Sequence, residues 1–92
     1  MICKFATSKA GHDTDKLYVI LGADERYVYL VDGKYKTMSH PKKKSRKHIQ
    51  IMNQTVDEKL LEQIKQRQTH IDDAIKYAIK QKLYSKLEET NV

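Results

Sequence analysis

Long apolar runs are absent from this sequence, which limits where the protein can work. No stretch approaches the roughly 20 consecutive apolar residues that a membrane-spanning helix needs. The first residues, Met1 to Phe5, lack the long apolar segment of a secretory signal. We therefore expect a cytoplasmic protein that has no membrane partner.

Cysteine occurs only once, so no disulfide can link two parts of the chain. Cys3 stands beside Ile2 and Phe5, and a thiol in such surroundings is more often packed in a core than reactive. Histidine is scattered, at His12, His40, His48 and His70, without the HxxxH or CxxC spacing of a metal site. We therefore expect neither a metal nor a cofactor.

The motifs of enzymes are missing as well. The sequence has no Ser/His/Asp arrangement, no glycine-rich phosphate loop and no paired carboxylates in apolar surroundings. A chain of this length buries only about 60–65% of its unfolded surface, which makes a large enclosed active site hard to build. We expect no catalytic residues and no enzymatic activity.

Acidic residues are also absent from the one window that holds all of the surplus positive charge. From Lys34 to His48 the chain carries seven Lys and Arg residues, whereas the remainder carries eleven against twelve Asp and Glu. The net charge of +6 is therefore concentrated in one segment. Such a concentration creates a local field that attracts polyanions.

The first half of the chain has the pattern of short β-strands. Runs of β-branched and aromatic residues at 16–21 and 26–31 are separated by the polar segment 22–25, which predicts an antiparallel hairpin. Further strands are expected at 3–8, 35–38 and 48–52, and a tight turn at Asp32-Gly33. Short strands at this spacing favour a small barrel, because a closed sheet has no exposed edge.

The second half changes to a helical period. Thr55 and Glu58 fit a capping box at the start of one helix, and Thr69 is expected to precede a second helix. Apolar residues then form one stripe, which consists of Ile71, Ala74, Ile75, Ala78, Ile79, Leu83 and Leu87. The sequence thus predicts an α+β protein, with a β-barrel over residues 1–53 and one or two helices over residues 54–92.

The basic segment 34–48 is expected to be a loop between two strands. Pro41 disfavours a helix before it, and five cations follow within the next six residues. These cations repel one another unless an anion lies nearby, and a phosphate backbone supplies negative charge at regular spacing. The residues of this segment expected to contact RNA are Lys34, Lys36, His40, Lys42, Lys43, Lys44, Arg46, Lys47 and His48. The alternative is a solvated loop that only improves solubility.

Four tyrosines, Tyr18, Tyr27, Tyr29 and Tyr35, lie in or beside the predicted hairpin strands. Exposed tyrosines can stack on unpaired bases. Tyrosines at alternate strand positions, however, more often pack in a core or across strands. Tyr27 and Tyr29 share one face, opposite Val28 and Leu30, and the sequence leaves open which face is the core.

Three segments in order resemble a known family. Residues 8–20 (SKAGHDTDKLYVI) resemble the KOW motif, and residues 27–34 (YVYLVDGK) and 41–48 (PKKKSRKH) resemble the segments that follow it in bacterial KOW-domain proteins. Those proteins are similar to the L14e/L6e/L27e group of ribosomal proteins, and residues 71–75 resemble their helical tail. The resemblance implies an SH3-like barrel, RNA binding and an association with the ribosome or the translation apparatus.

The resemblance also implies that the KOW loop, residues 10–16, contacts RNA. The motif usually has a glycine where this chain has Thr14-Asp15, and a carboxylate at that place would repel phosphate. The RNA contacts of this region are therefore assigned to Lys9, His12 and Lys16.

Two functions are consistent with these features. The first is a non-enzymatic protein that holds rRNA or another structured RNA through the basic loop and the KOW loop. The alternative is a protein–protein adaptor that binds a partner through the barrel and the apolar stripe of the C-terminal helix. Burial of that stripe against the barrel, or its exposure, distinguishes the two, because an exposed stripe needs a partner.

Overall fold

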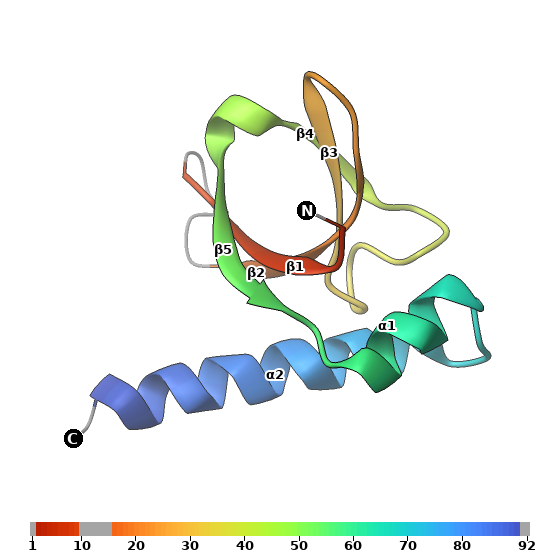
Figure 1. The fold of residues 1–92 in the computed structure, drawn as a ribbon, viewed down its shortest axis with the longest axis vertical. Helices are drawn as coiled ribbons and strands as arrows, with labels where there is room; N and C mark the ends of the chain where they lie inside the picture. The colour runs from red at the N-terminus through yellow and green to blue at the C-terminus, as the bar shows by residue number, and fades with distance from the viewer. Residues whose placement is uncertain (1, 10–15, 91–92) are drawn as a thin grey trace.

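The chain folds as a five-stranded antiparallel sheet followed by two helices, which confirms the predicted α+β class (Figure 1). The computed structural model describes residues 2–9 and 16–90, with side chains up to Tyr84. The strands are β1 (Lys4–Ser8), β2 (Leu17–Ala23), β3 (Tyr27–Val31), β4 (Lys42–Ser45) and β5 (Ile49–Thr55). A 3-10 turn, η2 (Arg46–His48), joins β4 to β5, and the helices are α1 (Glu58–Lys65) and α2 (Ile71–Thr90).

The sheet is apolar on both faces and curls around one of them. The strand order is β4-β3-β2-β1-β5, so β4 and β5 are the edges of the described sheet. Its inner face carries Ala6, Tyr18, Ile20, Val28, Leu30 and Ile49, and Figure 1 shows the strands curving around this side. Register shifts between Ile20 and Gly22 and between Lys4 and Ala6 increase the local twist, which helps the sheet to curl.

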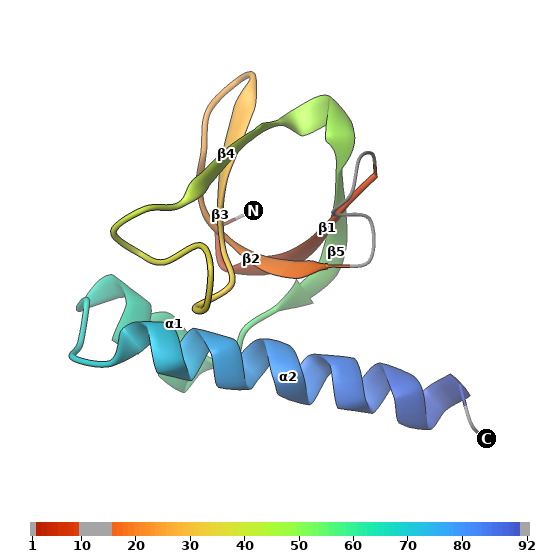
Figure 2. The ribbon, with the colours of Figure 1, turned by 180° about the vertical axis from the view of Figure 1, so that it is seen from behind.

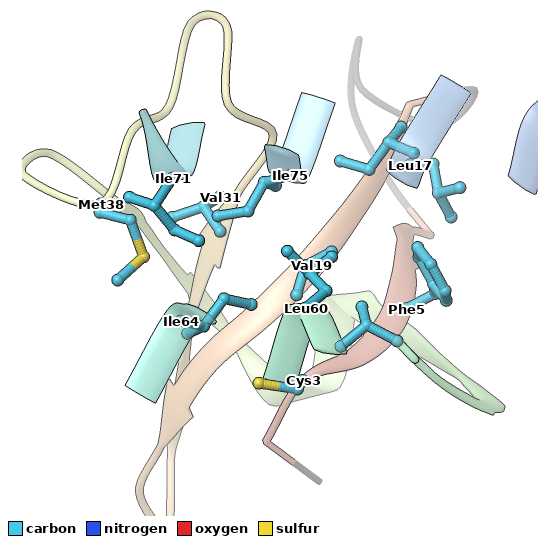
Figure 3. Close-up of a cluster of buried hydrophobic side chains, with 12 residues drawn as sticks. Cys3, Phe5, Leu17, Val19, Val31, Met38, Leu60, Ile64, Ile71 and Ile75 are labelled. Atoms are coloured by element: carbon cyan, nitrogen blue, oxygen red, sulfur yellow. The ribbon is translucent and has the colours of Figure 1, made fainter. Parts of the chain in front are cut away.

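Both helices pack against the outer face of the sheet (Figures 1 and 2). The cluster shown in Figure 3 joins the sheet to both helices. The strands contribute Phe5, Leu17, Val19 and Val31, and Cys3 lies just before β1. The helices contribute Leu60, Ile64, Ile71 and Ile75. The first part of the predicted apolar stripe is therefore buried on the sheet, whereas Leu83 is 41% exposed. In the described part of the chain, neither helix is both long and apolar enough to cross a membrane.

Cys3 is buried in the same cluster. Burial raises the pKa of its thiol, because the charged thiolate is poorly solvated there, and the charges of Lys65 and of the N-terminus oppose the shift. The prediction that Cys3 is a packed residue is confirmed.

The connection between β3 and β4 folds onto α2. The Asp32 carboxylate accepts hydrogen bonds from the backbone N–H groups of Lys34, Tyr35 and Lys36 at 2.8–2.9 Å. Gly33 has φ +79°, and a Cβ at this position would overlap the Asp72 carbonyl oxygen and lie 2.7 Å from Lys76 N. Further along, Met38 is buried, and its N–H donates to the Asp72 carboxylate at 2.8 Å.

The strand predicted at 35–38 is therefore wrong. The Asp32 side chain binds the three amides that a strand would need for its own pairing, so the chain closes a local turn instead. The turn expected at Asp32-Gly33 does exist, but it does not join two strands directly, since the next strand begins at Lys42.

The predicted basic loop is also wrong over residues 42–48. Residues 42–45 form β4, which pairs with β3, and residues 46–48 form η2. Lysine has a low strand propensity, so the sequence favoured a loop, but pairing with the buried strand β3 overrides that preference. The basic residues are therefore held by the sheet and its 3-10 turn.

The residue that caps α1 differs from the prediction, whereas the start of α2 agrees with it. Thr55 is the last residue of β5, and Asp57 caps α1 instead, by accepting a hydrogen bond from Leu60 N at 2.8 Å. The second helix begins at Ile71, close to the start predicted after Thr69, with Asp72 and Asp73 in its first turn. Acidic residues at this end of a helix are stabilised by its dipole.

Replacing Gly33 by Ala should destabilise the fold. A side chain at positive φ costs about 1–2 kcal/mol, and the added Cβ would meet helix backbone that cannot move easily. We expect a loss of at least about 2 kcal/mol in the free energy of unfolding, measured by urea denaturation followed by circular dichroism. The control is Gly22→Ala, where the nearest atom is Tyr29 Cδ2 at 3.9 Å; equal losses in the two variants would contradict the contact.

Truncating Ile75 should test the shared core of helix and sheet. Its side chain is 0% exposed, and Ile→Ala in a packed core costs about 2–5 kcal/mol. Tyr77→Ala is the matched control, because Tyr77 is on the same helix but 64% exposed, and its loss should stay near 0.5 kcal/mol. If Ile75→Ala costs no more than the control in thermal denaturation, α2 does not pack on the sheet as described.

Candidate nucleic-acid interface

The pleat of β4 divides its three lysines between the two faces of the sheet. Lys42 pairs with Leu30 and Lys44 pairs with Val28, and both partners belong to the inner face. Since cross-strand partners share a face, Lys42 and Lys44 are on the inner side, whereas Lys43 is on the outer side with Tyr29. The basic segment is therefore split between two surfaces.

The inner lysines are half-buried and have partners within the protein. Lys44 Nζ donates a hydrogen bond to Ser8 Oγ at 2.6 Å, and Lys42 Nζ lies 5.9 Å from the centre of the Tyr18 ring. Burial lowers the pKa of the Lys42 ammonium, and the positive charge of Lys44 acts in the same direction. Burial also raises the pKa of the Tyr18 phenol, and the charge of Asp32 adds to this shift.

β4 is an edge strand, which gives the inner lysines a structural role that needs no ligand. An unpaired edge can join strands of other molecules, and inward-pointing charged residues discourage such pairing. This role accounts for Lys42 and Lys44. It does not account for Arg46, Lys47 and His48, which follow the strand and are exposed.

The outer residues at this end of the sheet form a second, accessible surface. We call it the β3–β4 surface, and it consists of Arg26, Tyr27, Tyr29, Lys43, Arg46 and Lys47. Lys43 Nζ lies 4.2 Å from the centre of the Tyr27 ring. Arg46 N donates to the Arg26 carbonyl at 2.9 Å, and its guanidinium donates to the Asp24 carbonyl at 3.0 Å. Cations and aromatic rings are thus held side by side by backbone hydrogen bonds.

The structure decides which face of β3 is the core. Val28 and Leu30 are fully buried on the inner face, whereas Tyr27 is 36% exposed and Tyr29 is half-buried on the outer face. Tyr18 is buried and cannot stack on a base. Among Tyr18, Tyr27 and Tyr29, only Tyr27 and Tyr29 therefore lie on the outer face, where each is partly accessible to solvent.

Asp24 is the acidic residue at the β3–β4 surface. Its Oδ1 accepts hydrogen bonds from Tyr27 N at 2.7 Å and from Arg26 N at 2.9 Å, which closes the β2–β3 turn. The same two bonds hold the pKa of the Asp24 carboxyl below its ordinary value, and the charge of Lys43 acts in the same direction. This carboxylate therefore serves the turn and offsets only part of the local positive charge.

Two predicted RNA contacts that are distant in sequence lie next to each other. The backbone N–H of Lys9 donates to the His48 carbonyl at 2.7 Å, so the end of β1 lies beside η2. Lys9, Lys47 and His48 are all exposed. They extend the basic surface from η2 towards the start of the β1–β2 connection.

The remaining predicted contacts lie elsewhere. Lys16 and Lys34 both lie near the Tyr35 ring, with Nζ atoms 5.7 Å and 5.0 Å from its centre. Lys36 is half-buried and His40 is exposed in the connection between β3 and β4. His12 lies outside the described residues.

Arg26 was not identified from the sequence, because it stands at the edge of a hairpin turn between acidic residues and an apolar strand. Its proximity to Arg46 depends on pairing between β3 and β4, which brings Tyr27 opposite Ser45. No local pattern predicts this pairing. Among the side chains of residues 2–9 and 16–84, no three His, Cys, Asp or Glu lie close enough to bind a metal ion.

Comparison with known proteins does not assign the chain to a family. No protein-family model matches the chain, and none of the curated proteins matches it.

Proposed function

We propose that this chain is a non-enzymatic RNA-binding protein of the cytoplasm, built on an SH3-like barrel of the KOW type and associated with the ribosome or with translation. The ligand is rRNA or another structured RNA. Binding is mainly electrostatic, through phosphate contacts, with a smaller contribution from the exposed aromatic rings.

The topology supports an SH3-like barrel. β1 pairs with both β2 and β5, three sequential hairpin pairings connect β1 to β4, and a 3-10 turn joins β4 to β5. The inner apolar face around which these strands curl is typical of a small barrel core. The described part of the KOW-like segment 8–20 covers the last residue of β1 and the first part of β2, and the segments 27–34 and 41–48 cover β3 and the β4–η2 region.

The β3–β4 surface is the observation that carries the proposal. Arg46 and Lys47 are fixed on η2, and Lys43 is fixed on β4 over the Tyr27 ring. Because the sheet and η2 already hold the backbone of these residues, phosphate binding has to order only their side chains and not the chain that carries them. A solubilising loop needs no such arrangement.

The exposed η2 residues distinguish RNA binding from edge protection. Edge protection requires charge along β4, and Lys42 and Lys44 supply it. The consecutive basic residues Arg46, Lys47 and His48 lie past the strand, on the 3-10 turn η2, and their side chains are exposed. Their concentration next to Lys9 is explained by an anionic ligand.

A protein adaptor is the second candidate, and the exposed end of α2 favours it. Tyr84 is 52% exposed and Leu83 is partly exposed, whereas Ile71, Ile75 and Ile79 are already used in the protein's own core. Of the large apolar residues of the stripe whose side chains are described, Leu83 is therefore the one left for a partner, and Leu87 lies outside the described side chains. RNA affinity that depends on the β3–β4 surface would support the first function, and an absence of RNA affinity would favour the adaptor.

Removing charge from the β3–β4 surface should weaken RNA binding. We expect Lys43→Gln, Arg46→Gln and Lys47→Gln, combined in one variant, to raise the Kd for a structured RNA hairpin at least tenfold in fluorescence anisotropy. The slope of log K against log salt should also become shallower by about 2, since each lost phosphate contact contributes about 0.7–0.9. Lys42 and Lys44 stay in place, so the β4 edge remains protected.

The control removes the same number of charges from another part of the surface. Lys59→Gln, Lys65→Gln and Arg67→Gln lie on α1 and on the turn after it, where all three side chains are exposed. This variant should change the Kd less than threefold. Equal losses of affinity in the two variants would mean that only net charge matters, and the β3–β4 surface would then be excluded as the binding site.

A further inference from the structure

A second basic surface lies at the other end of the molecule, between the Asp32–Lys36 turn and α2. A groove of about 450 Å³ opens there, within the range of about 300–1,000 Å³ that small-ligand sites occupy. Four lysines line it, Lys16 before β2, Lys34 in the turn, and Lys76 and Lys80 one helical turn apart on α2. Lys16 and Lys80 are 64 positions apart in the sequence, and no charge run marks Lys76 and Lys80.

Tyr35 stands in this groove and is 68% exposed. The ring has the Nζ atoms of Lys16 and Lys34 at 5.7 Å and 5.0 Å from its centre, which keeps positive charge beside an accessible aromatic face. Packing does not explain the position of this ring, because most of its surface remains in contact with solvent. A flat ligand could cover it.

The floor of the groove is apolar, and Asp32, the one acid among the described lining residues, is occupied. Leu17, Ile79 and Leu83 provide aliphatic surface beneath the lysines. Asp32 is the acidic residue of the lining, and its Oδ1 accepts the three backbone hydrogen bonds of the turn. The groove therefore combines a positive rim with a surface suited to a planar, weakly polar group.

The groove is preformed by the contact between the turn and the helix. Gly33 lies directly against the backbone of Asp72 and Lys76, which sets the turn beside the helix face that carries Lys76 and Lys80. The Asp32 hydrogen bonds then fix the backbone of Lys34 and Tyr35. A site held in this way needs little reorganisation to bind a ligand.

We propose that this groove binds an unpaired nucleotide of the RNA, with the base stacked on Tyr35 and its phosphates contacted by Lys34, Lys76 and Lys80. A positive groove with an exposed aromatic ring is the arrangement that proteins use for single-stranded nucleic acid. An acidic peptide would satisfy the lysines but would leave the ring and the apolar floor without a planar partner. This inference rests on the proposed RNA-binding function and adds a second, chemically different contact to it.

The two surfaces lie apart on the molecule. The β2–β3 turn and η2 are at the end of the sheet away from α2, whereas the turn after β3 lies against α2 (Figures 1 and 2). A paired stem held at the β3–β4 surface and an unpaired segment held in the groove would together bind more tightly than either alone. The preferred ligand is then a stem with a single-stranded extension.

The experiment compares three RNAs by fluorescence anisotropy: a blunt hairpin, the same hairpin with five unpaired nucleotides at its 3′ end, and a five-nucleotide single strand. The extension should strengthen binding to the full chain at least fivefold. Tyr35→Ala should remove that gain and leave the affinity for the blunt hairpin within twofold. The combined Lys76→Gln and Lys80→Gln variant should also reduce the gain.

Tyr77→Ala and the combined Lys59→Gln and Lys65→Gln variant are the controls, because these exposed residues lie outside the groove. Both should keep the gain from the extension. If the extension adds no affinity, or if its effect survives in Tyr35→Ala, the groove does not bind nucleotides and the inference fails, while hairpin binding still supports the proposed function.

The five-nucleotide strand separates failure of the inference from failure of the proposed function. Binding of this strand that depends on Tyr35, in a protein with no affinity for the blunt hairpin, would uphold the groove and refute structured-RNA binding at the β3–β4 surface. Polyglutamate of equal length is the competitor that tests for charge alone. Displacement of the strand by equimolar polyglutamate would overturn the inference, because stacking would then contribute nothing.

Discussion

The close contact of Gly33 with the backbone of α2 is the constraint on which the arrangement of this protein depends. It permits the turn after β3 to lie directly on the first two turns of the helix. From there the chain buries Met38 beside Ile71 and returns to add β4 at the sheet edge. One residue without a side chain thus permits the close approach between the turn after β3 and the helix.

The lysine-rich segment has two roles because a strand, and not a loop, carries it. The pleat directs Lys42 and Lys44 to the inner side, where they protect an unpaired edge and bond within the protein. It directs Lys43 outward, and η2 then presents Arg46 and Lys47 beyond the strand. The run of positive charge therefore divides into two groups of residues. Lys42 and Lys44 discourage strand pairing at the sheet edge, whereas Lys43, Arg46 and Lys47 are available to a ligand.

The sequence predicted the elements whose signals are local. Alternating apolar residues located β1, β2, β3 and β5, and the spacing of Ile71, Ile75 and Ile79 located α2. The sequence did not predict β4, because lysines disfavour a strand and the pairing with β3 that overrides this preference is not local. It wrongly predicted a strand at 35–38, where the Asp32 side chain accepts the backbone hydrogen bonds of a turn. Of the candidate interface, the basic residues of segment 34–48 were identified from composition, whereas Arg26 was not. The division of the segment between two faces and the contribution of Lys76 and Lys80 depend on tertiary contacts that no local pattern encodes.

The core between sheet and helices also constrains how this chain can evolve. Val31 and Ile75 belong to one apolar cluster although they lie in different halves of the sequence. A change in the volume of one side chain must be matched by its neighbours, because packed interiors tolerate neither voids nor overlaps. The helical half could therefore not be exchanged between related proteins as an independent module, and the two halves are expected to have diverged together.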